Sequence, residues 1–293
     1  MKTFLSIIIP YHERTELLKE LIQSIPKASG LEVIVVDDHS SESFSEDYLE
    51  KFESYKFIKN KPELRYAGTA RNTGIENVSG EYVFFADSDD LIIQDGFLKC
   101  LKILYEKKPD ILFAKSSSFK DKDGSRGKRH ISHNWLIQSV LNKSPVEILA
   151  RSSGPIAKFI RTEYINQHDI RFETQRYSND IVFSASLMFY KPCVHIVDEI
   201  IYSIREGHQS LISDLSLESS LTRLDTLFRY NALLKKNGLS YLMVPALIIL
   251  FRLLKHDKIL TIIYAWRTIT SGFPLFFSIW NLKNIFMRYL SDY

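Results

Sequence analysis

Apolar runs of strand length alternate with helical periodicity over the first hundred or so residues. The runs FLSIIIP, LEVIVVDD, YKFI, EYVFFA and DILFAK are nearly continuous, as in strands that are buried on both faces of a parallel sheet. Between them, residues 14–25, 69–78 and 96–106 repeat apolar side chains at helical spacing, and residues 45–52 predict a short helix. This alternation predicts βα units that build a mostly parallel sheet with flanking helices.

The middle of the chain has a less regular pattern. The segment SSSFKDKDGSRGKRH has no apolar periodicity and predicts a mobile loop. It is either a solvated excursion or a flap near an anionic ligand. Farther along, NWLIQSVLN and residues 179–190 predict helices, GPIAKFI predicts an extended segment, and CVHIVDE and IIYSIRE predict two short strands.

From about Ser216 onward the pattern predicts helices alone. LESSLTRLDTLFRYNALLKK is amphipathic, and residues 239–290 contain six Lys or Arg against a single acid, Asp257. These helices could pack on the core or on another subunit, or they could lie on anionic lipid with their apolar side chains inserted. We therefore expect an α/β domain over residues 1–213 and a helical region over 214–293 that associates with membrane or forms a homo-oligomer.

Composition narrows the class of protein and its compartment. The 293 residues are 45% hydrophobic, enough for a packed core, and the net charge of +3 does not favour nucleic acid as a partner. Cys100 and Cys193 have neither disulfide-framework nor zinc-site spacing, so a reducing cytoplasm is the default. The first apolar stretch is shorter than a signal peptide needs, and no apolar run reaches the roughly 20 residues of a spanning helix.

Carboxylates follow two of the predicted strands. Asp37 and Asp38 come after VIVV, and Asp87, Asp89 and Asp90 come after YVFFA. Parallel strands present their carboxyl ends at one edge of a sheet, where ligands bind, so these acids should meet there. Crowded carboxylates raise one another's pKa unless a cation relieves them, and Mg²⁺ or Mn²⁺ commonly links such a site to a diphosphate. Asp90 is expected to cap the next segment instead.

The order of IIIPYHE, VIVVDDHS and RYAGTARNTGIENVSGEYVFFADSDD resembles family 2 glycosyltransferases of the GT-A fold. That family includes many bacterial capsule and lipopolysaccharide sugar transferases. The resemblance covers about residues 3–210 and does not extend to the helical tail. It implies an α/β, Rossmann-like GT-A fold with a helical C-terminal extension, a UDP-sugar donor, and Mn²⁺ or Mg²⁺ as cofactor.

The resemblance also implies a role for each matched residue. Asp180, in RFETQRYSND, matches the general base, although relatives commonly carry glutamate where this chain has Asn179. The other matched residues divide into nucleotide-binding residues (Pro10, Tyr11, Glu13, Asp38, Arg71, Asp87 and Ser88), metal ligands (Asp87, Asp89 and His208) and contacts to the acceptor or diphosphate (Lys158 and Arg205).

Each matched residue also has a plain structural interpretation. Pro10 could simply end a strand, and Glu13 and Asp180 could simply open helices. Arg71 and Lys158 could be surface side chains, and a lone loop histidine is more often neither a metal ligand nor a diphosphate ligand. Sequence alone leaves these alternatives open.

The expected activity is an inverting, metal-dependent transfer of a hexose or hexosamine from a UDP-sugar to a hydroxyl. The acceptor would be a bacterial surface glycan or a lipid-linked glycan, which places the enzyme at the inner face of the cytoplasmic membrane. A nucleotidyltransferase is one alternative, but the chain lacks a Gly-rich phosphate loop near its first strand. An inactive GT-A scaffold in a membrane assembly is the other, and the intact Asp38, Asp87, Asp89 and Asp180 argue against it.

Overall fold

A computed structural model describes residues 3–42, 44–207 and 214–276. The chain divides into two compact units, Met1–Gly207 and His208–Tyr293. Each unit is described by itself. The division falls a few residues before the boundary expected from the sequence.

The first unit is built on an eight-stranded sheet with the order β3-β2-β1-β4-β7-β6-β8-β5. Only β7 and β5 run against the other strands: β7 is antiparallel to β4 and β6, and β5 is antiparallel to β8. The prediction of a mostly parallel sheet is therefore confirmed. The strands are β1 (Leu5–Tyr11), β2 (Leu31–Asp37), β3 (Ser54–Lys59), β4 (Tyr82–Phe85), β5 (Leu91–Ile92), β6 (Ile111–Lys120), β7 (Lys158–Arg161) and β8 (Val194–Glu206).

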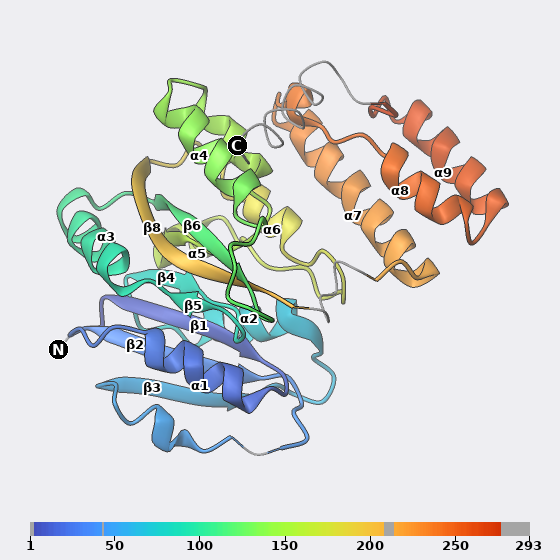
Figure 1. Cartoon of the computed structure of the whole chain (residues 1–293). Helices are drawn as coiled ribbons and strands as arrows, with labels where there is room; N and C mark the ends of the chain where they lie inside the picture. The colour runs from blue at the N-terminus through green and yellow to red at the C-terminus, as the bar shows by residue number, and fades with distance from the viewer. Residues whose placement is uncertain (1–2, 43, 208–213, 277–293) are drawn as a thin grey trace. The chain divides into compact units, whose positions relative to one another are not determined.

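Helices flank the sheet (Figure 1). Alternate residues of a strand face opposite sides of the sheet, and the two sides hold different helices. Ile7 and Ile9 of β1 belong to the same buried cluster as apolar residues of α1 and α3, whereas Ile34 and Val36 of β2 cluster with Ala70 of α2. The helices of this unit are α1 (Thr15–Ser24), α2 (Tyr66–Glu76), α3 (Gln94–Lys107), α4 (Ile131–Leu141), α5 (Thr162–Gln167) and α6 (Ile181–Ser186), with 3₁₀ turns η1 (Glu46–Tyr48) and η2 (Val146–Arg151).

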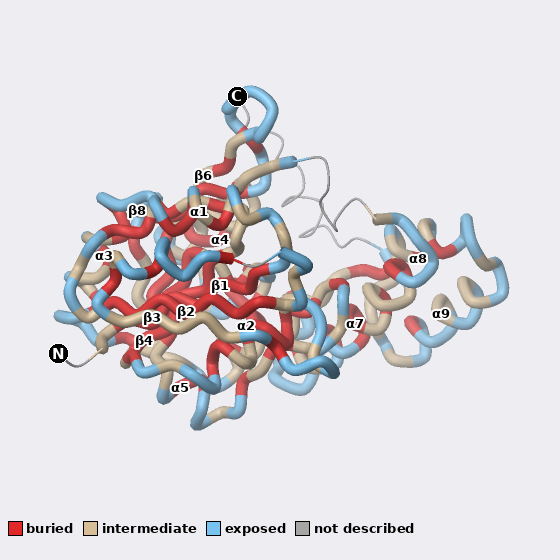
Figure 2. The backbone as a smooth tube through the Cα atoms, turned by 90° about the horizontal axis from the view of Figure 1, so that it is seen from below, coloured by how far each residue is buried: buried red, intermediate tan, exposed pale blue. Residues whose placement is uncertain are grey.

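The central strands are buried along their whole length, as Figure 2 shows for β1 and β2. Their continuous apolar runs follow from helices on both faces. The helix α2 lies so close to β1 that a Cβ at Gly74 would be 2.4 Å from Cγ2 of Ile8. A side chain at position 74 would push α2 away from β1. Glycine at this position therefore allows α2 to pack closely on the sheet.

Two predictions for the middle of the chain are wrong. The segment expected to be a mobile loop continues β6 as far as Lys120, pairs with β8, and bridges from Phe119 to Arg126. The two short strands expected near the end of the unit are one strand, β8. The register shifts around Lys115, and the extra residues lie in β8, where Ile196 to Tyr202 oppose Phe113 to Ser116. The pairing partner is far away in sequence, so local polarity alone did not reveal this strand.

Two helix predictions were too long. Residues 45–52 contain only the three-residue turn η1, and residues 179–190 contain only the six-residue helix α6. The segment that leads into α6 has a left-handed residue, Ser178, with φ of 55°. A helix cannot pass through that conformation, so α6 begins after it.

The second unit consists of α7 (Leu217–Lys236), the 3₁₀ turn η4 (Ser240–Leu242), α8 (Leu247–Leu254) and α9 (Lys258–Thr270). Two of these helices have side-chain N-caps: Ser216 Oγ accepts a hydrogen bond from the amide of Ser219, and Asp257 Oδ1 accepts one from the amide of Leu260. Successive helices pack on each other, α7 against α8 and α8 against α9. The amphipathic helix predicted from the sequence is α7.

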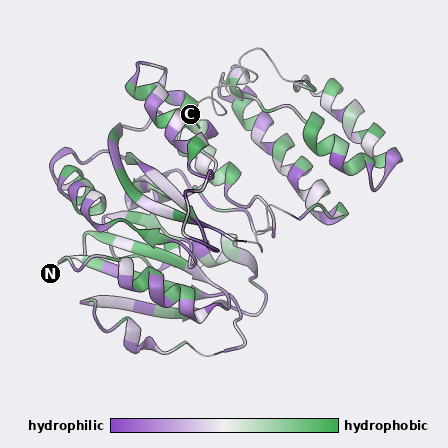
Figure 3. Ribbon diagram, in the orientation of Figure 1, coloured by the Kyte–Doolittle hydropathy of each residue, from purple (hydrophilic) through white to green (hydrophobic). Residues whose placement is uncertain are grey.

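Large apolar side chains remain exposed on α8 and α9, whose ribbons are strongly hydrophobic in Figure 3. Exposed residues are Ile248, Phe251, Leu254, Ile259, Ile262, Ile263, Trp266 and Ile269. Within the residues that the structure places, no helix combines the length and apolar character needed to cross a bilayer.

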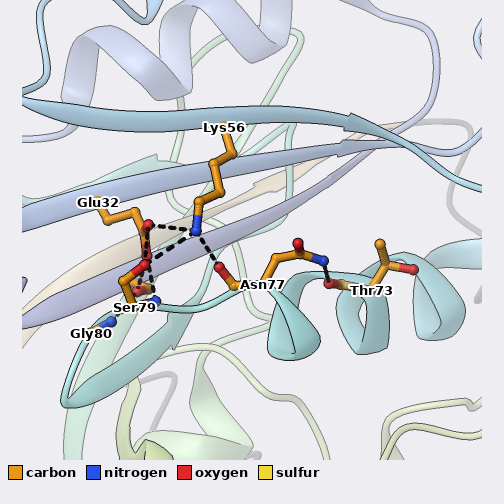
Figure 4. A network of polar contacts seen from close by, with 7 residues as sticks. Glu32, Lys56, Thr73, Asn77, Ser79 and Gly80 are labelled. Atoms are coloured by element: carbon orange, nitrogen blue, oxygen red, sulfur yellow. Dashed lines mark hydrogen bonds and ion pairs between the residues drawn. The ribbon is translucent and has the colours of Figure 1, made fainter.

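A buried glutamate ties β1, β2 and β3 together near their first residues, at the edge opposite the carboxyl ends (Figure 4). Glu32 accepts hydrogen bonds from Ser6 Oγ (2.5 Å), from the amide of Ser79 (2.9 Å) and from Lys56 Nζ (3.0 Å). Burial favours the neutral carboxyl, but these donors outweigh it, so the pKa of Glu32 lies below its ordinary value. Its stabilisation is complete above the unfolded pKa and is lost as the pH falls through the native pKa.

We predict that Glu32→Gln lowers the free energy of unfolding by about 2 kcal/mol at neutral pH, because charge-assisted hydrogen bonds become neutral ones. Urea denaturation measures this difference. Glu50→Gln, at an exposed position, is the matched control and should change stability by less than about 0.5 kcal/mol. The gap between Glu32→Gln and wild type should narrow below the ordinary glutamate pKa of 4.5, and a constant gap in acid would contradict this account.

Candidate active site

The carboxyl ends of β1, β2 and β4 lie at one edge of the sheet, because these strands are parallel neighbours. The first residue of β7 reaches the same edge, since β7 is antiparallel to β4 and pairs Phe159 with Phe84. The loops that follow or precede these ends contain nearly all the predicted site residues. The sheet therefore brings together segments far apart in sequence.

The acid loop, residues 87–90, follows β4 and is held in place by hydrogen bonds to residues of β8. The hydroxyl of Tyr202 accepts a hydrogen bond from the amide of Asp87 (2.8 Å) and donates one to the carboxylate of Asp90. Asp90 is buried and also accepts a hydrogen bond from the amide of Arg205 (2.7 Å). It does not cap the next helix, whose N-cap is Ile93, so that expectation is wrong. Asp90 instead fixes the loop that presents Asp87 and Asp89.

Arg71 connects the acid loop to the segment before α6. Its guanidinium donates to Asp87 Oδ1 (2.5 Å) and to Asn179 Oδ1 (3.2 Å), and it lies over the ring of Phe172. The side chain is only 6% exposed, so the alternative of a helix-surface arginine is wrong. Asn179, where relatives commonly have glutamate, gives Arg71 a neutral acceptor.

Asp180 follows Asn179 and is the N-cap residue of α6, without a side-chain capping hydrogen bond. Its side chain is half-buried. Burial raises the pKa of Asp180, and the positive charges of Arg71 and Lys158 oppose that rise. Within the described part of the chain, no other residue donates a hydrogen bond to this carboxylate. Asp180 is thus a partly shielded carboxylate with its acceptor capacity unused.

Asp89 lies in the acid loop, close to the charged side chains of Arg14 and Asp87. Its carboxylate is 3.3 Å from Arg14 Nη1, and both side chains are partly exposed. Burial and the charge of Asp87 raise the pKa of Asp89. Burial, Asp87 and Asp89 likewise raise the pKa of Asp90 well above its ordinary value. Burial and mutual repulsion therefore disfavour the charged forms of Asp89 and Asp90 in this loop.

The loops after β1 and β2 are bonded to each other and to α2. Asp38 accepts hydrogen bonds from the amide of Tyr66 (2.7 Å) and from Asn60 Nδ2 (3.2 Å). Glu13 accepts from the amide of Ser41 (2.7 Å), and its own amide donates to Ser40 Oγ (2.9 Å). Asp38 and Glu13 thus hold loop backbones in place at the edge where a nucleotide was predicted.

Tyr11 is placed differently from what base stacking requires. The residue is 1% exposed, its hydroxyl is 2.9 Å from Thr15 Oγ1, and its ring lies near Phe44. In this arrangement the ring presents no open face to a base. Pro10 is the penultimate residue of β1, paired with Val36, and it is also buried.

Four predicted residues remain. Ser88 is half-buried in the acid loop, and His208 lies outside the described residues. Arg205 donates to the carbonyl of Asp89 (2.7 Å) and pairs with Asp121 (2.8 Å) and Glu20, so it supports the acid loop from the protein side. Lys158 is fully buried, and the alternative of a surface lysine is wrong.

Six of the ten non-glycine residues with positive φ among the described residues lie in the loops of this edge. Non-glycine residues adopt positive φ rarely and at an energetic cost, and such positions cluster at functional sites. Here they occur after β1 and β2, at the start of α2, and before β7 and α6: Glu13, Arg14, His39, Tyr66, Ala157 and Ser178. The backbone strain therefore coincides with the predicted site.

Several residues that organise the site were not found from the sequence. They are Arg14, Asn60, Tyr66, Tyr202 and His133. Only Arg14 carried a usable signal, as a cation beside the predicted Glu13. The others act through hydrogen bonds to partners in other segments of the chain, and the sequence pattern does not encode such pairs.

Comparisons with known proteins identify the family of this chain. The family model described as glycosyl transferase family 2 matches residues 6–169. GlyG, a glycosyltransferase of Streptococcus pneumoniae serotype 4, is 23% identical over 221 residues, covering 71% of this chain and 73% of GlyG. TarP of Staphylococcus aureus, a poly(ribitol-phosphate) beta-N-acetylglucosaminyltransferase, is 25% identical over 227 residues, 73% of this chain and 64% of TarP. The chain thus spans less than two thirds of TarP.

A solved structure shows the same fold. Residues 1–349 of S. aureus TarS, crystallised with UDP-GlcNAc, match with a TM-score of 0.67 at 19% identity, over 88% of this chain and 74% of that chain. The family model covers more than half of the sequence. The chain belongs to glycosyl transferase family 2, and its fold is the GT-A fold expected from the sequence.

We predict that Tyr202→Phe destabilises the acid loop, because the amide of Asp87 and the carboxylate of Asp90 both lose their link. The free energy of unfolding should fall by about 1–3 kcal/mol, measured in urea. Hydrogen exchange at residues 87–90 should rise. Tyr105→Phe, at an exposed position, is the control. Unchanged exchange in the acid loop would show that Tyr202 does not hold it.

Proposed function

We propose that this protein is an inverting, metal-dependent glycosyltransferase that moves a hexose or hexosamine from a UDP-sugar to a hydroxyl group. The observation that carries the proposal is the bridge from Arg71 to Asp87 and Asn179. It joins the acid loop, suited to a sugar nucleotide, to the segment that presents Asp180. Donor and acceptor chemistry would then occur at one sheet edge.

Asp180 is the general base in this proposal. In a single displacement, the acceptor hydroxyl attacks the anomeric carbon, its proton passes to a carboxylate oxygen of Asp180, and the bond to the diphosphate breaks. Partial burial supports this role because a carboxylate with a raised pKa binds a proton more readily. Its unused acceptor capacity leaves room for the hydroxyl of the acceptor.

Asp87 and Asp89 suit a hard divalent cation, because Mg²⁺ and Mn²⁺ prefer oxygen ligands. The raised pKa of Asp89 and its pairing with Arg14 fit a site with negative charge to neutralise. When bound, the cation would stabilise the charge of the departing diphosphate. No three ligating side chains cluster in the part of the chain that the structure covers, so phosphate oxygens would complete the coordination.

The nucleotide and the acceptor are proposed from the relatives. TarS was crystallised with UDP-GlcNAc, and the name of TarP describes transfer of N-acetylglucosamine to poly(ribitol phosphate). A UDP-hexosamine donor and a bacterial surface glycan or lipid-linked acceptor fit this chain by analogy. Asp38, Glu13, Pro10 and Tyr11 border the proposed nucleotide position, and contact with the base requires Tyr11 to leave its buried arrangement.

Neither alternative activity has comparable support. Membership in a sugar-transferring family argues against a nucleotidyltransferase. An inactive scaffold has no need of an unpaired, half-buried Asp180 beside an acid loop. A UDP-release assay with several UDP-sugars and Mn²⁺ separates the three possibilities, since sugar transfer releases UDP, whereas nucleotidyl transfer from a UDP-sugar would yield UTP or UMP products and an inactive scaffold would release nothing.

We predict that Asp180→Asn lowers turnover by about 10²–10⁴-fold, the usual contribution of general-base catalysis. UDP binding with Mn²⁺, measured by calorimetry, should stay within about twofold. Asp89→Asn should instead weaken UDP–Mn²⁺ binding. Asp169→Asn, at an exposed carboxylate, is the control for both assays. A fully active Asp180→Asn enzyme, or a wild-type protein that binds no UDP, would refute the proposed function.

The helical unit supports a further part of the proposal, contact with an anionic membrane surface. Arg252, Lys255 and Lys258 accompany the exposed apolar residues of α8 and α9, against the capping acid Asp257. Apolar side chains inserted at the interface and basic side chains near lipid phosphates are the features of a peripheral membrane contact. Such a contact would place the enzyme beside a lipid-linked acceptor at the inner face of the cytoplasmic membrane.

We predict that Ile262→Ser combined with Trp266→Ser weakens binding to phosphatidylglycerol vesicles by about tenfold or more, because two apolar side chains no longer insert. Sedimentation with vesicles measures the bound fraction. Tyr105→Ser matches the exposure of these residues (71% against 69% and 67%) and serves as the control. Equal sedimentation of all variants would refute the membrane contact, and a concentration-dependent dimer abolished by the same pair would assign the face to a homo-oligomer.

A further inference from the structure

The first residue of β7 is a buried lysine, which is unexpected at the edge of the sheet where the loops lie. Lys158 has no exposed surface, and its ammonium donates hydrogen bonds to the carbonyl of Ser152 (2.8 Å) and to the carbonyl of Gly154. It also lies over the ring of Phe113, 5.5 Å from the centroid. Burying an ammonium is costly unless hydrogen bonds and opposite charge compensate. Both of these hydrogen bonds are made to backbone carbonyls of one loop.

That loop, residues 152–157, is fixed from two sides. Ser152 ends η2, and its hydroxyl is 2.9 Å from Nδ1 of His133, whose Nε2 donates to the carbonyl of Ala114 in β6 (2.8 Å). Ala157, at the other end of the loop, is buried in the left-handed conformation with φ of 54°. Lys158 therefore holds the backbone of a loop whose conformation is strained at its far end.

The turn that precedes this loop packs against the helix that begins after the proposed base. The turn η2 packs against α6, and Asp180 is the N-cap residue of α6. By holding the carbonyl of Ser152 at the end of η2, Lys158 fixes the element on which α6 rests. Its position at the first residue of β7 also puts its charge at the sheet edge where Asp180 lies.

We propose that Lys158 is a positioning residue for the general base: it holds the 152–157 loop and, through Ser152, the end of the turn η2 that packs against α6, and it supplies a buried positive charge that acts on the carboxylate of Asp180. This inference rests on the proposed function for the meaning of Asp180. Lys158 would touch neither donor nor acceptor, which departs from the contact expected from the sequence.

The charges around the pair agree with this role. Burial lowers the pKa of Lys158 to about 7, and Asp180 opposes that fall. In return, Lys158 and Arg71 oppose the rise that burial causes in the pKa of Asp180, while Asp87 adds to it. Burial also lowers the pKa of His133 to about 4, so His133 is neutral at neutral pH, and Lys158 is the group of this pair that carries positive charge as the pH falls below about 7.

The test compares Lys158→Met with wild type in two measurements that need no turnover. Carbon-13 titration of side-chain carboxyls, with Asp180 assigned by the signal missing in Asp180→Asn, should show its pKa raised by on the order of one unit. Hydrogen exchange of residues 148–157 should increase. Lys115→Met removes a partly buried lysine from β6, where it pairs with Asp198 and Gln138, and should change neither reading.

Activity adds a readout that loss of packing alone would not produce. The acid limb of the kcat–pH profile should move to higher pH in Lys158→Met, and kcat should fall on the order of 10²-fold while UDP–Mn²⁺ binding stays near wild type. If Met at this position prevents folding, Lys158→Gln, which keeps N–H donors without the charge, makes the same comparison. Unchanged titration of Asp180 together with unchanged exchange overturns the inference. A wild type that releases no UDP from any UDP-sugar defeats the proposed function instead, and the titration and exchange still decide the role of Lys158.

Discussion

The arrangement of the site depends on one buried guanidinium. Arg71 is held in α2, whose distance from β1 is set by Gly74, and it bonds at the same time to the acid loop and to the segment before α6. A planar guanidinium directs its donors along fixed lines, so one side chain fixes the relative position of two segments that the chain itself places about a hundred residues apart. Without Arg71, the loop that carries Asp87 and the segment that carries Asp180 would lose the side chain to which both are hydrogen-bonded.

The two edges of the sheet treat charge in opposite ways. At the edge where the strands begin, Glu32 is matched by a lysine and several hydrogen bonds, and its pKa is lowered. At the edge where they end, Asp89, Asp90 and Asp180 all have raised pKa values. Balanced burial stabilises a fold, whereas unbalanced carboxylates favour a ligand that brings positive charge or gives up a proton to them. The charged groups that stabilise the fold and the carboxylates proposed for the chemistry therefore lie at opposite ends of the same strands.

The sequence predicted the elements that follow from local repeating patterns, and it missed those that depend on pairing between distant segments. The apolar runs of β1, β2 and β4 are local signals, and topology then forces their terminal acids to one edge, so the place of the site could be predicted. The long β6–β8 pair could not, because its polar outer half resembles a loop until the partner strand is known. Lys158 and Tyr11 were misjudged in exposure for the same reason: burial depends on elements elsewhere in the chain. The family resemblance supplied roles, and the structure supplied the contacts through which those roles would be exercised.

A crystal structure with UDP and Mn²⁺ tests the central claim most directly, since anomalous scattering locates the metal independently of any relative. The account predicts one Mn²⁺ peak between the carboxylates of Asp87 and Asp89, with the diphosphate on its far side and the uridine near the loops after β1 and β2. A metal and nucleotide bound elsewhere on the protein, with Asp87 and Asp89 still occupied by Arg71 and Arg14, would contradict it.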